Sequence, residues 1–164
     1  MFLYFCVASI GLMYQLLLFY HSVVRWFVLA GLLTVIYRAW LGYSKKKSFS
    51  AIDNAVRHWT ATIAHIQLLI GIGLYTQSPL IKYFWKHKRE ALLNSDALFF
   101  SLIHILLMLS AIVIITIGAA IAKRKTADIE KHRTLLHWFS LALLIIIIAI
   151  PWPFSPWVHR PYLR

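Results

Sequence analysis

The chain has 164 residues, 61% of them hydrophobic, and its mean hydropathy of +0.73 is far above that of an ordinary soluble domain. It carries 17 Lys and Arg against 5 Asp and Glu, a formal net charge of +12, and most basic residues lie at the ends of apolar segments. Basic residues at such positions orient membrane proteins and meet anionic headgroups, so we expect no nucleic-acid binding. Cys6 is the only cysteine, which excludes a disulfide framework, a Cys-rich zinc site, a Cys-ligated iron–sulfur cluster and covalent c-type haem attachment.

Long apolar stretches dominate the chain. A helix needs about 20 apolar residues to cross the hydrocarbon core of a bilayer. Four stretches have this character and use up most of the sequence. We therefore predict an all-α integral membrane protein with a single domain, residues 1–164, built as an up-down-up-down bundle of four transmembrane helices. The predicted crossings cover about residues 16–40, 59–77, 97–121 and 135–150.

The segments between the crossings carry the polar residues. The first crossing ends in an aromatic belt and a lysine run, and residues 48–53 read as the start of the second helix. Residues 80–96 form a polar connection in which aromatic residues lie beside basic ones, a pattern typical of a short interfacial helix. The third crossing ends at the basic run 123–125, and residues 126–130 read as an N-cap with acidic residues in the first turn. Pro151 ends the fourth crossing at an aromatic interface.

The placement of Lys and Arg predicts the orientation. The connections after the first and third crossings hold most of the basic residues: Lys45, Lys46, Lys47 and Arg57 in one, and Lys123, Arg124, Lys125, Lys131 and Arg133 in the other. Both should be cytoplasmic, which places the N- and C-termini outside. Residues 1–24 carry no charge, which favours the same orientation. The connection after the second crossing also holds four basic residues, which weakens the asymmetry.

Residues 1–12 form an apolar extension. A single helix from Met1 to Trp40 would be about 60 Å long, roughly twice the hydrocarbon thickness. The extension lacks the positive n-region of a signal peptide. Two alternatives remain open: Met13 is the true start, or residues 1–12 lie at the outer interface beyond a bend near Gly11.

Histidines are the informative polar residues of the crossings, because ionisable side chains inside a membrane are costly and usually face a bundle interior or a cofactor. His87 and His159 fall in polar ends, while His58 and His132 flank the cytoplasmic interface. The remaining four, one in each crossing, are His21, His65, His104 and His137.

Depth sorts these four into two layers. At about 1.5 Å per residue, His21 and His104 should be level within about 3 Å, near the outer face. His65 and His137 should lie in the inner third, with depths that differ by about 6 Å. Alternate helices of an up-down bundle are diagonal neighbours across the core. The first and third helices therefore predict an outer pair, and the second and fourth predict an inner pair.

Two histidines at one depth on facing helices are what a b-type haem needs as axial ligands. We predict His21 with His104 as one ligand pair and His65 with His137 as the other, for one or two haem b groups. Zinc fits less well, because four ligands would have to converge at one level. No Asp or Glu lies within a crossing, so a carboxylate proton relay or a metal-coupled transporter lacks its usual parts.

Some roles stay open. His132 competes with His137 as the ligand from the fourth helix. Arg25, four residues after His21 on the same helical face, could pair with a haem propionate or extend to the outer interface. In the alternative class, a haem-free scaffold or accessory subunit, the histidines and Arg25 only hydrogen-bond within the bundle.

Several stretches match a known pattern: MYQLLLFYHSVVRW at 13–26, AHIQLLIGIGLY at 64–75, SLIHILLMLSAIVIITIG at 101–118, and EKHRTLLHWF with AIPWPF within 130–154. In these stretches the sequence resembles small bacterial membrane proteins of four helices that carry the label cytochrome B. The resemblance covers nearly all of the chain from Met13 on, and it favours Met13 as the start.

The resemblance implies a haem site made of His21, Arg25, His65, His104 and His132. It thereby favours His132 over the deeper His137, and it implies a place in the bacterial inner membrane. We expect an electron carrier or redox-complex subunit more than a stand-alone enzyme, because no substrate-processing centre is visible. Quinone and other membrane redox subunits are the candidate partners. A bis-histidine haem has no open coordination position, which argues against oxygen chemistry at the iron.

Overall fold

The computed structural model describes residues 2–153, 155 and 158, and every regular element in this part of the chain is a helix. Four helices are long: α1 (Phe2–Ser44), α2 (Ala51–Gln77), α6 (His104–Arg124) and α7 (Asp128–Ala149). Between α2 and α6 lie the short α3 (Pro79–Lys86), α4 (Lys88–Ala91), α5 (Ser95–Leu98) and a π-helical turn, η1 (Phe99–Ile103), which runs directly into α6. The predicted all-α class is confirmed.

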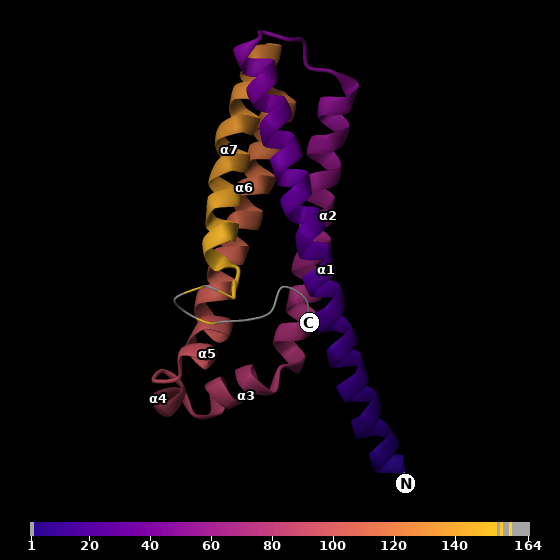
Figure 1. Cartoon of the computed structure of the whole chain (residues 1–164), viewed down its shortest axis with the longest axis vertical. Helices are drawn as coiled ribbons and strands as arrows, with labels where there is room; N and C mark the ends of the chain where they lie inside the picture. The colour runs from indigo at the N-terminus through magenta and orange to yellow at the C-terminus, as the bar shows by residue number, and fades with distance from the viewer. Residues whose placement is uncertain (1, 154, 156–157, 159–164) are drawn as a thin grey trace.

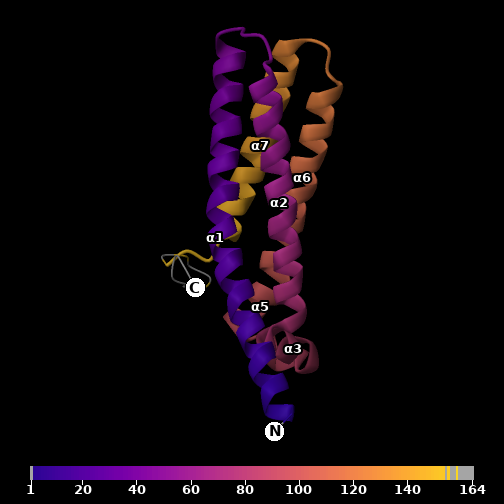
Figure 2. The same cartoon turned by 90° about the vertical axis from the view of Figure 1, so that its right-hand side faces the viewer.

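The four long helices lie side by side, each antiparallel to the next along the chain (Figure 1 and Figure 2). α1 packs against α2 and α7, and α6 packs against α7 and α2. α1 and α6 are therefore diagonal partners, as are α2 and α7. The α1–α2 and α6–α7 connections lie at one end of the molecule, which we call the short-loop end, and α3, α4 and α5 lie at the opposite end, the α3 end (Figure 1).

The core between the long helices is apolar and rich in small residues. Its fully buried members include Leu32, Ala64, Ala111, Ile115, Leu135, Phe139 and Ala142. Small residues allow helices to approach each other closely. At Gly118 of α6, a Cβ atom would overlap Trp138 of α7, so the close contact of these two helices requires glycine there.

α2 begins with a capping box. The Asp53 backbone N–H donates to the Ser50 hydroxyl at 3.2 Å, and the Ser50 backbone N–H donates to the Asp53 carboxylate at 2.8 Å. The same carboxylate accepts a hydrogen bond from Arg38 Nε of α1 at 2.7 Å. One acidic residue therefore fixes both the start of α2 and its attachment to α1.

Three helices of the described chain are long and apolar enough to cross a membrane: Gly11–Ser44, Ser95–Arg124 and Asp128–Ala149. α2 has sufficient length, with 27 residues, but it is not among the three, because polar residues such as His65 and Gln67 lower its hydropathy. The predicted crossing over residues 59–77 therefore lies on a helix that the hydropathy criterion does not select.

The long helices extend beyond the predicted crossings. α1 begins at Phe2 and passes through Gly11 without interruption, and its N-terminal part extends past the α3 end of α2 (Figure 1). α7 begins at Asp128, ahead of the predicted start near residue 135. Hydropathy marks only the apolar part of a helix, whereas backbone hydrogen bonding continues through polar turns to the caps.

Candidate functional site

Two of the predicted ligand residues meet across the bundle. His21 of α1 and His104 at the start of α6 have their ring centres 6.4 Å apart, with an angle of 65° between the ring planes. They come from diagonal helices and lie at the same level, as the depth estimate predicts. No ring contact of this kind joins His65 to His132 or His137, whose positions the structure also describes.

His104 is oriented by the end of α7. Its Nδ1 lies 2.8 Å from the carbonyl oxygen of Ala149, the last residue of α7. Carbonyls at a helix C-terminus have no partner within the helix, so this one is free to accept. Because a carbonyl can only accept, a neutral His104 carries its proton on Nδ1 and keeps the lone pair of Nε2 free for another partner.

A π-helical turn precedes His104. η1 covers Phe99–Ile103, and the rings of Phe99 and Phe100 lie 5.8 Å and 6.0 Å from the His104 ring. The hydroxyl of Tyr75 donates to the Ser101 carbonyl at 3.2 Å and accepts from the indole N–H of Trp85 at 3.0 Å. Isolated π-helical turns occur frequently at functional sites, because they change the direction of the side chains around them.

His21 is positioned by residues of α2. The side-chain amide of Gln67 donates to the His21 backbone carbonyl at 2.9 Å, which ties α2 to α1 at this level. A Cβ atom at Gly71 of α2 would lie 3.3 Å from Cε1 of His21, so glycine leaves the space that the imidazole needs. The Nδ1 atom of His21 is buried and has no hydrogen-bond partner. A bound ligand can supply the missing partner of such a buried ring nitrogen in an apolar bundle.

A cavity of about 430 Å³ lies beside the two imidazoles. Its walls come from all four long helices and from α3, and they are mostly apolar, with Met108, Ile112 and Leu68 among them. Its polar lining residues are Tyr14, His21, Ser22, Arg25, Gln67, Tyr75, Ser78, Asp96 and His104. A volume of roughly 300–1,000 Å³, an apolar wall and a few converging polar groups are the usual features of a small-molecule or cofactor site.

The separation of the two rings fits ligation of one metal. Metal–imidazole bonds are about 2 Å long and a ring centre lies about 1 Å behind its nitrogen, so two axial imidazoles have ring centres roughly 6 Å apart. The observed 6.4 Å agrees with this value. His21 and His104 could therefore hold the iron of a haem, and Arg25, which also lines the cavity, could hold a propionate.

The inner histidines are arranged differently. His65 and His137 are exposed, and each lies with Nδ1 on the carbonyl four residues earlier in its own helix, at 2.7 Å from Ala61 and 2.8 Å from Arg133. Nε2 of His65 also lies 3.2 Å from the Thr116 hydroxyl of α6. These contacts satisfy the two rings locally and do not direct them toward each other.

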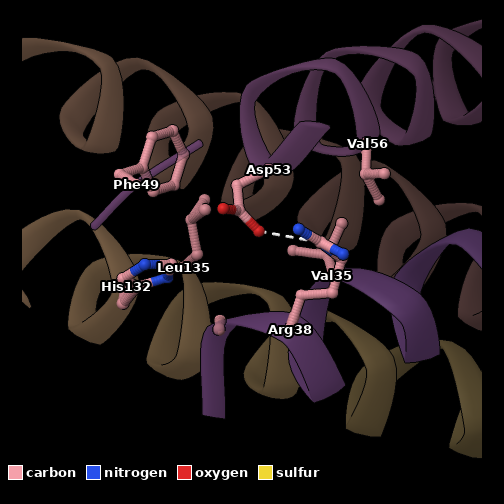
Figure 3. Close-up of a pocket in the computed structure, with 8 residues that line it drawn as sticks. Val35, Arg38, Phe49, Asp53, Val56, His132 and Leu135 are labelled. Atoms are coloured by element: carbon pink, nitrogen blue, oxygen red, sulfur yellow. Dashed lines mark hydrogen bonds and ion pairs between the residues drawn. The ribbon is translucent and has the colours of Figure 1, made fainter. Parts of the chain in front are cut away.

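His132 is buried at the short-loop end, with 1% of its surface exposed, and neither ring nitrogen has a partner. Figure 3 shows it beside Phe49, with the Arg38–Asp53 pair on the other side of a small cavity. That cavity has about 10 Å³, room for about one water molecule and far less than a haem requires. The resemblance favoured His132 as a ligand, but the space around it does not fit the group.

Asp53, at this end and outside the predicted crossing, has a shifted pKa. Burial by itself would raise the pKa of its carboxyl group, but hydrogen bonds from Ser50 and Arg38 outweigh burial and hold the pKa below its usual value. The carboxylate is therefore charged throughout the neutral range and pairs with Arg38.

Three contributors to the site were not predicted as such. Gln67 is the only amide side chain in residues 59–75, and that rarity was the available signal for its role. The η1 turn and the Ala149 carbonyl leave no mark in hydropathy or residue type, so only the three-dimensional structure identifies them.

No group of three or more His, Cys, Asp or Glu residues in the described chain is placed to hold a metal ion. A haem site needs only two histidines from the protein, so it differs from a metal site built from three or more of these side chains. Comparisons of the chain with protein-family models, curated proteins and solved structures gave no match.

Proposed function

We propose that the chain is a four-helix integral membrane protein that holds one b-type haem between His21 and His104 and carries electrons as a redox subunit. One observation carries the proposal: two imidazoles from diagonal helices lie with their ring centres 6.4 Å apart, beside a cavity of about 430 Å³. In an apolar bundle this arrangement supports haem better than any other cofactor class.

The residues around the pair have definite roles in this proposal. Ala149 fixes the His104 tautomer, as acceptors behind metal-binding histidines commonly do. Gln67 fixes the backbone of His21, and Arg25 supplies a positive charge for a carboxylate. A haem held by His21 and His104 would supply one-electron chemistry, and the activity that fits it is electron transfer.

In this proposal α2 also crosses the membrane, together with α1, α6 and α7. Its length suffices, and its polar groups meet protein partners: Gln67 donates to α1, and His65 lies beside Thr116 of α6. Polar side chains that are satisfied between helices cost much less in a bilayer. Four crossings would place both termini on one side, and the basic short-loop end favours an N-out, C-out orientation in a bacterial inner membrane. Quinone and other redox subunits are the partners that such a location would offer.

We propose one haem per chain and no second haem at His65, His132 or His137. The small cavity at His132 and the local hydrogen bonds of His65 and His137 support this choice. His65 and His137 have no ligand role in this proposal.

The first test is spectroscopic. The full chain, purified in mild detergent from haem-replete cells, should give a reduced-minus-oxidised b-type spectrum and a pyridine haemochrome with one haem per chain. His21→Ala and His104→Ala should each abolish the spectrum. A colourless wild-type protein would overturn the proposal.

Matched histidine variants test the assignment of the ligands. His65→Ala and His137→Ala alter histidines at similar positions on α2 and α7, and each should retain the full haem content. If instead His65→Ala removes haem while His21→Ala retains it, the assigned pair is wrong.

The second candidate function is a haem-free scaffold or accessory subunit. The observation in its favour is the hydrogen bond from His104 to Ala149, because it also caps the C-terminus of α7 without any cofactor. In that case His104→Ala would lower thermal stability, whereas a wild-type sample would show no haem absorption at any loading.

A further inference from the structure

The α3 end carries a cluster of exposed basic and aromatic side chains. We call it the basic ledge, and it consists of Lys82, Tyr83, Trp85, Lys86, Lys88 and Arg89 on α3 and α4. Tyr83 and Trp85 are 41% and 49% exposed. The ledge holds four basic residues, and Glu90 is the one acidic residue within 79–91. Ion pairs occur away from the ledge, at Asp53, Asp128 and Glu130.

The ledge is held in place from behind. The other side of α3 buries Ile81 and Phe84, and Phe84 packs with Ala91 and Ala97 in a small core of its own. The indole N–H of Trp85 donates to the Tyr75 hydroxyl at 3.0 Å, and Lys88 Nζ lies 5.3 Å from the centre of the Trp85 ring. The charged groups are thus presented on a fixed surface.

The position of the ledge relates it to the membrane. α3 begins directly after α2 ends, and α5 leads into the next long helix, so the ledge lies where two long helices leave the bundle. α3 runs across the direction of the long helices at this end (Figure 1). When the long helices cross a bilayer, as proposed above, this level is that of the lipid headgroups.

We propose that the basic ledge is a binding surface for anionic phospholipid headgroups of the leaflet at the α3 end. Lys and Arg attract phosphate groups there, and Trp and Tyr have their preferred place at the same depth. The position of these aromatic and basic residues together, at the level of the headgroups, favours a lipid surface over an acidic protein partner. The inference rests on the proposed membrane insertion and is independent of haem.

Hydrogen exchange can localise the binding. The full chain is placed in nanodiscs of phosphatidylcholine alone or of phosphatidylcholine with phosphatidylglycerol, and exchange of backbone amides is followed by mass spectrometry. Phosphatidylglycerol should slow exchange in peptides covering residues 79–91, and the effect should fall in high salt, which screens the charges. Equal exchange in the two lipid mixtures would overturn the inference, and an acidic protein partner would be the remaining occupant.

Charge variants test the cause. Lys82→Gln, Lys86→Gln, Lys88→Gln and Arg89→Gln together should lower the preference for phosphatidylglycerol over phosphatidylcholine by at least about tenfold, since each basic residue near an anionic surface strengthens binding by roughly fivefold. The charge-preserving Lys82→Arg, Lys86→Arg and Lys88→Arg should retain the preference. Lys45→Gln, Lys46→Gln and Lys47→Gln, at the short-loop end, should leave the protection of residues 79–91 unchanged. Protection that survives the glutamine variants overturns the inference.

Alkaline carbonate extraction separates this inference from the proposed function. A chain that leaves the membrane in carbonate refutes the membrane insertion and the lipid surface together. A chain that stays in the membrane but shows no phosphatidylglycerol effect refutes the lipid surface alone.

Discussion

Hydrogen-bond partners divide the histidines of the long helices into two kinds. His65 and His137 bond to their own helices, four residues back, and need nothing further. His104 reaches the end of another helix, and His21 keeps a buried nitrogen without a partner. In the proposed function, a ligand completes the second kind. His132 of α7 also has unpartnered ring nitrogens, but it lacks the space of the His21–His104 cavity. At the scale of single residues, the candidate site therefore combines an unsatisfied ring nitrogen with a cavity large enough for a ligand.

Two glycines of α2 give a sharp test at this scale. A Cβ at Gly71 would lie 3.3 Å from Cε1 of His21, whereas a Cβ at Gly73 would lie at an ordinary 3.7 Å from Leu17. Gly71→Leu should displace the imidazole and remove at least 90% of the bound haem, as roughly a tenfold loss per 1.4 kcal/mol of disturbed ligation implies. Gly73→Leu, the matched control, should keep its haem. The haem content of both variants is measured as the pyridine haemochrome. An equal loss of haem in the two variants would contradict the assigned position of His21.

At the scale of helices, the ends carry most of the specific polar interactions. Asp53 closes a capping box and pairs with Arg38, Asn94 caps α5 by accepting from the Ala97 backbone N–H, and His104 caps the end of α7. The sequence predicts the cap of α2, because Ser50 and Asp53 lie in the segment 48–53. It does not predict that α7 is capped by a side chain 45 residues away, since such a partner is set by tertiary packing alone.

Asp53 makes the stability of the short-loop end dependent on pH. Its pKa in the folded chain lies below the ordinary value of about 4, so its contribution to stability is present above that value and is lost as the pH falls through the folded pKa. Asp53→Asn should lower the free energy of unfolding by about 1–3 kcal/mol at pH 7, and the difference from wild type should shrink toward pH 3. Thermal unfolding in detergent at several pH values measures this.

Glu130→Gln is the control for that titration. Glu130 is 52% exposed in its ion pair with Lys125, and exposed pairs of this kind contribute little. The variant should unfold like wild type at every pH. A constant difference between Asp53→Asn and wild type from pH 7 to pH 3 would show that the carboxylate charge is not what stabilises this end.

At the scale of the whole molecule, the proposed four-helix insertion requires that α2 crosses the membrane together with α1, α6 and α7. Single cysteines can report it in a Cys6→Ser background. If α2 crosses, Ser48→Cys and Thr126→Cys should react with a membrane-impermeant maleimide from one side, and His87→Cys should react from the other. Labelling of all three positions from the same side of sealed vesicles would mean that α2 does not cross.

Hydropathy selects three of the four long helices as able to cross a membrane, because apolar side chains dominate their whole length. It was least reliable for α2, where polar residues face other helices and lower the mean. Depth along each helix predicted the meeting of His21 and His104, since rise per residue is nearly constant in a helix. It could not predict that His65 and His137 turn to their own helices, because rotation about the helix axis and side-chain rotamers are set by packing.

α7 ends level with His104, so the facing histidines lie at one end of the bundle and not at its middle. In the function proposed above, an electron that enters this single haem also leaves on the same face of the membrane. Turnover then moves no charge across the membrane potential, which would otherwise exchange about 2.3 kcal/mol per electron for each 100 mV. A protein built in this way can pass electrons between partners on one face at a rate that the energised state of the membrane does not control.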